Sequence, residues 1–187
     1  MNTYDFDKTI FYPDSSACFY RYCLRHCPAA VLPTVPKSLA MALRYRRGRE
    51  GARELKQQLF SFLPRIADID RLVADFWAEN EKGIGEWYLR QKKSDDLILS
   101  ASPRFLLQPI CDRLSVSLIA TEMDKHSGKI TGLNCHDREK VRRFYELYPD
   151  GHTEAFYSDS LSDTPMAEIA DRAFLLKKHR IFPWPGK

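Results

Sequence analysis

Short apolar runs alternate with longer amphipathic stretches through the second half of this 187-residue sequence. The apolar runs have the length of buried strands, and the stretches between them have helical spacing. We predict strands at 97–100, 116–123, 129–133, 154–158 and 174–177 and helices at 103–114, 136–148 and 164–170. The second and third of these strands, joined by a turn at 124–128, form a β-hairpin. Strands separated by helices usually form a mainly parallel sheet with right-handed crossovers, so the sequence predicts an α/β fold.

A helical segment interrupts this pattern near the start of the chain. Residues 2–7 read as a strand followed by a loop, whereas residues 14–90 read as almost entirely helical. Leu55, Leu59, Phe62 and Leu63, for example, recur at the spacing of one helix face. We therefore expect an α/β core built from residues 1–13 and 91–187, with an all-helical insertion at 14–90 after the first strand.

The charge and the apolar content narrow the class of protein. No apolar run approaches the roughly 18 residues that a membrane-spanning helix needs, and the N-terminus does not read as a secretory signal. We therefore expect a cytoplasmic protein. Residues 37–57 contain seven Lys or Arg and two Glu, so this segment has a net charge of +5, whereas the whole chain has a net charge of +4. Any anionic partner should meet the protein at this segment.

Polar residues stand where the predicted strands end or the following helices begin. Asp5 and Asp7 lie two apart after the first strand, so their carboxylates point to the same side. Such a pair repels unless a cation or a reaction uses it. Because ligands of open α/β sheets bind at the carboxyl ends of the strands, we expect one site there. Its candidate residues are Asp5, Asp7, Ser100, Lys140, Asp159 and Asp163.

This set of residues resembles the four motifs of the haloacid dehalogenase (HAD) superfamily of phosphohydrolases. Residues 5–9 (DFDKT) fit the first motif, Ser100 the second, Lys140 the third, and Asp159-x-x-x-Asp163 the fourth, in the right order. The resemblance covers nearly the whole chain. It implies a Rossmann-like, mainly parallel sheet core and gives the helical insertion the role of a cap over the site.

The resemblance also implies a reaction. Asp5 would be the nucleophile that forms an aspartyl-phosphate, and Asp7 the general acid and later the base. Ser100 and Lys140 would bind the phosphate, and Lys140 would also stabilise the phospho-aspartate.

A magnesium ion is implied by the same resemblance. Asp5, the backbone carbonyl of Asp7 and Asp159 would hold Mg²⁺, with waters and the phosphate completing the shell. Asp163 would hold the metal-bound waters or Lys140 from nearby. The implied enzyme is a Mg²⁺-dependent phosphomonoester hydrolase.

The leaving group remains open between two branches of the superfamily. The insertion resembles the cap of phosphoserine phosphatase-like enzymes, although Lys8 stands where they usually have Ser and Asp14 where they have Glu. A small phosphorylated metabolite is the favoured substrate. Residues 19–49 also resemble phosphatidylglycerophosphatase C-type proteins, which implies the alternative of a lipid phosphatase that docks its basic helix on an anionic membrane.

Two further alternatives remain. Phosphotransfer to an acceptor other than water shares the covalent intermediate. A nucleic-acid-binding module would use the basic patch between Lys37 and Lys56. Its support is charge alone, so we expect no nucleic-acid partner.

Overall fold

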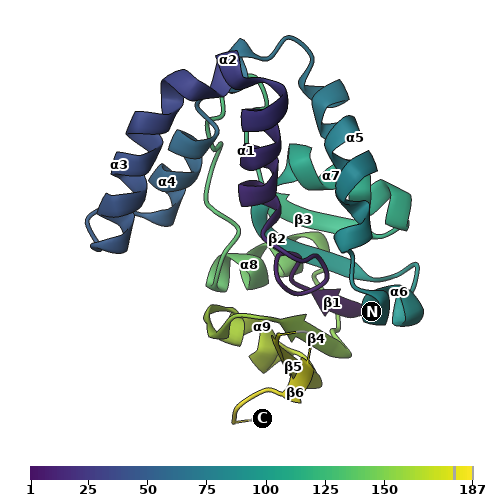
Figure 1. Cartoon of the computed structure of the whole chain (residues 1–187). Coiled ribbons are helices and arrows are strands. Elements are labelled where there is room, and N and C mark those ends of the chain that lie inside the picture. The colour runs from purple at the N-terminus through teal and green to yellow at the C-terminus, as the bar shows by residue number, and fades with distance from the viewer. Residues whose placement is uncertain (179, 187) are drawn as a thin grey trace.

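The computed structural model describes residues 1–178 and 180–186 (Figure 1). In this part of the chain the strands form a six-stranded sheet in the order β3-β2-β1-β4-β5-β6. Neighbouring strands are parallel except β6, which runs antiparallel to β5. The strands are β1 (Asn2–Tyr4), β2 (Leu97–Pro103), β3 (Ser117–Thr121), β4 (Ala155–Ser158), β5 (Arg172–Lys177) and β6 (Arg180–Pro183). The predicted α/β class with a mainly parallel sheet is confirmed.

The alternation of side chains along β2 explains how the sheet is covered. Leu97 and Leu99 point into one apolar cluster and Ile98 into the other, because successive strand residues face opposite sides. The first cluster is closed by α8 (Arg138–Leu147) and α9 (Thr164–Ile169). The second is closed by α7 (Arg104–Leu114) together with helices of the insertion. The sheet is therefore a central layer between two helical layers (Figure 1).

The insertion between β1 and β2 is helical, as expected. It contains α1 (Ser15–His26), α2 (Pro28–Val31), η1 (Leu32–Thr34), α3 (Val35–Arg46), α4 (Ala52–Leu59), η2 (Leu63–Arg65), α5 (Ile69–Asn80), η3 (Glu81–Gly83) and α6 (Glu86–Gln91). Asp14 begins α1 and Asp68 begins α5, and each carboxylate accepts a hydrogen bond from a first-turn N–H, at 2.9 Å. In Figure 1, α3 and α4 lie side by side as a hairpin that projects from the body.

Aromatic side chains join the insertion to the sheet. Phe6 and Phe11, in the loop after β1, both meet the Trp77 ring of α5 edge to face, with centroids 5.8 and 5.1 Å apart. The Trp77 indole N–H donates to the Leu106 carbonyl of α7 at 2.6 Å. Burying aromatic rings supplies much of the packing energy of such a core, so α5 is held firmly against the sheet.

The structure departs from the sequence prediction in two places. The predicted hairpin is wrong in its second strand: β3 ends at Thr121, and residues 129–133 keep only a bridge between Met123 and Ile130. The two hydrogen bonds around this bridge, Asp124 N–H to Lys129 O and Thr131 N–H to Glu122 O, are made, but Gly132 then has φ +90° and takes the chain out of the extended conformation. Ile130 faces the other way, with its N–H donating to Gln57 Oε1 and its carbonyl accepting from Arg53 of α4. Strand β6 was not predicted, since its four residues are all exposed and carry no alternating pattern.

In the parts of the chain that the structure describes, no helix combines the length and the apolar character needed to cross a membrane.

Candidate active site

The six polar residues singled out in the sequence lie around one cavity at the carboxyl ends of the strands. Its volume is about 440 Å³. Asp5 directly follows β1, Ser100 lies in β2, and Asp159 directly follows β4. Lys140 comes from the first turn of α8, and Asp163 from η4 (Leu161–Asp163). The adjacency of β1 to both β2 and β4 explains why segments distant in sequence meet here.

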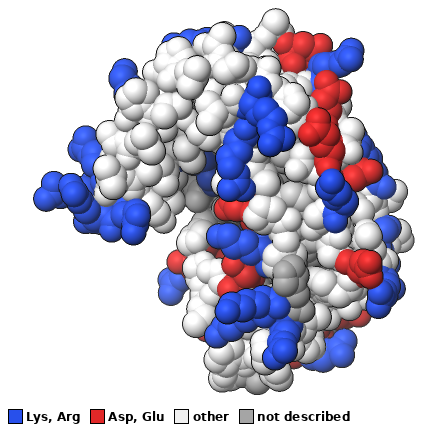
Figure 2. Space-filling view, viewed as in Figure 1, with Lys and Arg blue, Asp and Glu red and all other residues white. Residues whose placement is uncertain are grey.

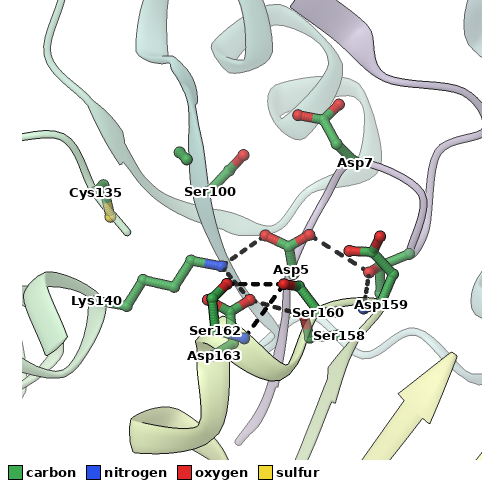
Figure 3. A network of polar contacts seen from close by, with 12 residues as sticks. Asp5, Asp7, Ser100, Cys135, Lys140, Ser158, Asp159, Ser160, Ser162 and Asp163 are labelled. Atoms are coloured by element: carbon green, nitrogen blue, oxygen red, sulfur yellow. Dashed lines mark hydrogen bonds and ion pairs between the residues drawn. The ribbon is translucent and has the colours of Figure 1, made fainter. Parts of the chain in front are cut away.

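The Lys140 side chain makes the central contact of the site. Its Nζ atom lies 2.6 Å from Asp5 Oδ1 and 2.7 Å from Asp163 Oδ2 (Figure 3). Only 1% of Lys140 is exposed. Asp163 also accepts a hydrogen bond of 2.7 Å from the Ser158 hydroxyl, and its carboxylate does not cap α9. A buried ammonium held by two carboxylates has its position fixed tightly.

The electrostatics of the site favour an added cation. Burial raises the pKa of Asp5 to about 7; the Lys140 charge opposes this rise, while Asp163 and Asp7 add to it. Burial alone would lower the pKa of Lys140, but the carboxylates of Asp5 and Asp163 raise it above its ordinary value. Burial also raises the pKa of Asp159, against the nearby charge of Lys8. The site therefore holds more buried carboxylate than its lysines neutralise.

Asp7 is held by two donors from different elements. Its Oδ1 accepts a hydrogen bond of 2.6 Å from the N–H of Ser15, at the start of α1, and its Oδ2 one of 2.5 Å from the Ser102 hydroxyl. Burial and the nearby Asp14 raise the pKa of Asp7, and the two donors partly offset this. A carboxyl group with a raised pKa that is held in one orientation is suited to donate a proton.

The loop after β1 places these carboxylates. Phe6 O accepts from the N–H groups of Ile10 and Phe11, which closes a tight turn. Lys8 at its tip has φ +58°, in the left-handed region that non-glycine residues rarely adopt. The buried Thr9 links both sides of the site: its hydroxyl lies 3.4 Å from Asp5 Oδ2 and accepts from the Asp159 N–H at 3.0 Å.

Three residues of the site were not anticipated from the sequence. Ser102 stands two residues after Ser100 in the same strand, a spacing that could have indicated a shared face. Lys56 of α4 reaches into the cavity, where its Nζ donates to Ala101 O and, at 2.8 Å, to Asn134 Oδ1. No local pattern marks Lys56 or Asn134, because these contacts join residues far apart in the chain.

The donors present are compatible with magnesium. Among residues 1–178 and 180–186 there is no group of three or more His, Cys, Asp or Glu able to hold a metal by themselves. Mg²⁺, however, keeps several waters and needs only one or two protein carboxylates. Asp5 and Asp159 supply them from adjacent strand ends, and both carry raised pKa values that a dication would reverse.

The site combines an aspartate at the end of a central parallel strand with a lysine buried against it, a geometry in which a carboxylate could act as a nucleophile beside a fixed positive charge. Comparison with known families identifies the class of protein. A family model described as haloacid dehalogenase-like hydrolase matches residues 3–168, and the chain belongs to this family. No functionally curated protein matches the sequence.

Several solved structures share the fold. A protein of unknown function from Bordetella pertussis Tohama I aligns over 100% of this chain and 91% of its own, with 21% identity and a TM-score of 0.79. A phosphoserine phosphohydrolase-like protein from Francisella tularensis aligns over 96% and 88%, with 17% identity and a TM-score of 0.57. A phosphoserine phosphatase solved as a phospho-aspartyl intermediate analogue aligns over 91% and 83%, with 15% identity and a TM-score of 0.59.

Proposed function

We propose that the protein is a Mg²⁺-dependent phosphomonoester hydrolase that works through an aspartyl-phosphate on Asp5 and acts on a small phosphorylated metabolite. The observation that carries the proposal is the buried Lys140 ammonium 2.6 Å from Asp5 at the floor of the cavity. It can hold the incoming phosphate and balance the charge of the phosphorylated aspartate. The intermediate analogue seen in a structurally similar phosphoserine phosphatase supports the same route.

The reaction needs two steps. A carboxylate oxygen of Asp5 attacks phosphorus, and the bond from phosphorus to the leaving-group oxygen breaks as Asp7 donates its proton to that oxygen. Water then attacks the phosphorus of the aspartyl-phosphate while the Asp7 carboxylate accepts a proton from it. Inorganic phosphate leaves, and Asp5 is again a carboxylate. Ser100 and Lys140 hold the non-bridging phosphate oxygens through both steps.

Mg²⁺ would be held by Asp5, the Asp7 carbonyl and Asp159, and when bound it supplies charge neutralisation for the phosphate. Asp163 acts as a positioning residue, since its bonded oxygen already accepts from Lys140 and Ser158.

The helical insertion provides the leaving-group side of the cavity, which is why we assign it the role of a cap. Tyr45, Leu55 and Leu59 form an apolar wall, and Lys56 adds a positive charge opposite the phosphate floor. A leaving group with a small apolar part and an anionic group fits this lining.

The direct test is phosphate release from a panel of phosphomonoesters with and without Mg²⁺, comparing the wild type with Asp5→Asn. We expect Mg²⁺-dependent turnover by the wild type and none above background by Asp5→Asn, which keeps the shape but removes the nucleophile. Mass spectrometry after an acid quench should find one phosphoryl group on the N-terminal peptide. Phosphate release by Asp5→Asn at the wild-type rate would refute the proposed route.

A further inference from the structure

The outer face of the α3–α4 hairpin carries large apolar side chains that no other part of the described chain covers. The exposed fractions are 57% for Leu32, 62% for Leu39 and 52% for Leu43. Leu39 and Leu43, four residues apart, lie on one side of α3, and Leu32 lies just before this helix in η1. Ser38, on the opposite side, is buried against α4, where its hydroxyl lies 3.5 Å from Gln58 O. We call the surface formed by these three leucines the α3 face.

Basic side chains surround the α3 face. They are Lys37, Arg44, Arg46, Arg47 and Arg49, all exposed. Arg44 pairs with Glu50 at 2.9 Å, and within the described chain the other four form no ion pair. Four of the five lie at the end of α3 or just after it, and Figure 2 shows basic side chains gathered at this free tip of the hairpin, beyond the hollow that separates the hairpin from the core. The hairpin therefore combines an uncovered apolar stripe with a cluster of unpaired positive charge.

We propose that the α3 face docks on an anionic lipid bilayer. A helix that lies in a membrane interface has this composition, with leucines entering the acyl boundary and arginines meeting lipid phosphates. A second copy of the chain fits less well, because residues 32–49 contain no Asp or Glu, so a pairing of two α3 faces would cover the leucines but offer the arginines no acidic partner. Nucleic acid would pair with the charges but leave the leucines in water, since its backbone offers no apolar surface.

The position of the hairpin connects this surface to the active site. Tyr45 lies in the last turn of the same helix, and it lines the cavity together with Leu55 of α4. A docked α3 face would therefore hold the mouth of the cavity beside the lipid headgroups. The docking itself rests on the exposed face alone and does not depend on the proposed hydrolysis.

The test is co-sedimentation of the full-length protein with vesicles of phosphatidylglycerol and phosphatidylcholine, compared with pure phosphatidylcholine. We expect binding to the anionic vesicles that weakens with salt. Leu39→Glu/Leu43→Glu and Arg46→Glu/Arg47→Glu should each reduce it by ~tenfold or more. Leu147→Glu, at a leucine that is also 62% exposed, and Arg71→Glu/Arg90→Glu are the matched controls and should bind as the wild type does.

Any of three binding results would overturn the proposal. Equal sedimentation with both vesicle types, or equal loss in the controls, would mean that the α3 face is not the contact. A dimer in light scattering that Leu39→Glu/Leu43→Glu abolishes, without vesicle binding, would assign the face to a second copy. Retention on a DNA or RNA duplex without vesicle binding would assign it to nucleic acid. Phosphate release by the leucine variant in solution checks that the site is intact, and absence of release in all variants would count against the proposed function only.

Discussion

The hydroxyl of Ser102 donates a hydrogen bond of 2.5 Å to Asp7 Oδ2, and this bond fixes the orientation of the proposed general acid. Ser102 is 4% exposed and also lies within 3.2 Å of the Ser15 and Ser16 hydroxyls at the start of α1. The strand β2 and the first helix of the insertion therefore meet at one serine. Proton donation and the placement of the insertion are linked through it.

Ser102→Ala should lower kcat/KM by roughly tenfold, because a hydrogen bond to a charged group typically contributes about 1.5 kcal/mol or more. The bond stabilises the Asp7 carboxylate and so lowers its pKa. Without it the pKa rises, and the fall in kcat/KM at high pH, where Asp7 loses the proton it must donate, should move to higher pH. The measurement is the pH profile of kcat/KM. Ser117→Ala, on the exposed side of β3, is the control, and an unshifted profile would exclude the positioning role.

Lys56 should make substrate affinity fall above pH 8. Burial lowers its pKa to about 8, although Asp7 and Asp14 oppose the change. As the pH rises through this value the ammonium loses its charge, so KM for an anionic phosphomonoester should increase in the wild type. In Lys56→Met, KM should already be raised at pH 7 and should change little through pH 8. Parallel profiles for the two proteins would show that Lys56 does not meet the substrate.

The same shift predicts a stability change with a definite sign. Between pH 8 and the ordinary lysine value of about 10.4, the unfolded chain keeps a proton that folded Lys56 has released. The free energy of unfolding should therefore gain a component that rises with pH in this window. Urea titrations at several pH values should show a smaller rise for Lys56→Met than for the wild type.

The residues grouped around the cavity could be anticipated from the sequence because each one is marked locally. Asp5 ends an apolar run, Ser100 ends another, and Lys140 lies in the first turn of a helix, so parallel topology brings them to one edge. The insertion could be predicted because helical periodicity and caps such as Asp68 are also local signals.

The rest depends on tertiary contacts that no window of sequence contains. Lys56 reaches the site because α4 packs on the segment after β3, where Asn134 Oδ1, 78 positions away, accepts a hydrogen bond from the ammonium. The predicted second hairpin strand is short for a local reason instead: Gly132, with φ +90°, ends the extended conformation directly after the Thr131 N–H to Glu122 O bond. Strand propensity at 129–133 thus gave only a single bridge, because a glycine with positive φ interrupts the run.

Magnesium should stabilise the protein through Asp159. Burial raises the pKa of Asp159 and Asp5, which means that folding disfavours their charged forms, and a bound dication offsets this cost. Mg²⁺ at about 100 times its dissociation constant should add ~2.7 kcal/mol, seen as a higher Tm that EDTA reverses. Asp159→Asn should lose most of this shift together with Mg²⁺-dependent turnover. Asp171→Asn, at an exposed carboxylate, is the control; an unchanged shift in Asp159→Asn would place the metal elsewhere.

The junction between the insertion and the segment after β3 has no room for a side chain at Gly128. A Cβ atom there would lie 2.4 Å from Phe60 O, whereas at Gly132 nothing lies within 4 Å. Both glycines have positive φ, +71° and +90°. Gly132→Ala should therefore cost only the backbone strain, ~1–2 kcal/mol. Gly128→Ala should cost clearly more, because its Cβ must push Phe60 and α4 away. Urea denaturation of the two variants separates these contributions.

Gly128→Ala should also raise KM, since moving α4 displaces Lys56. Equal stability and equal KM in the two variants would show that Phe60 moves aside at no cost.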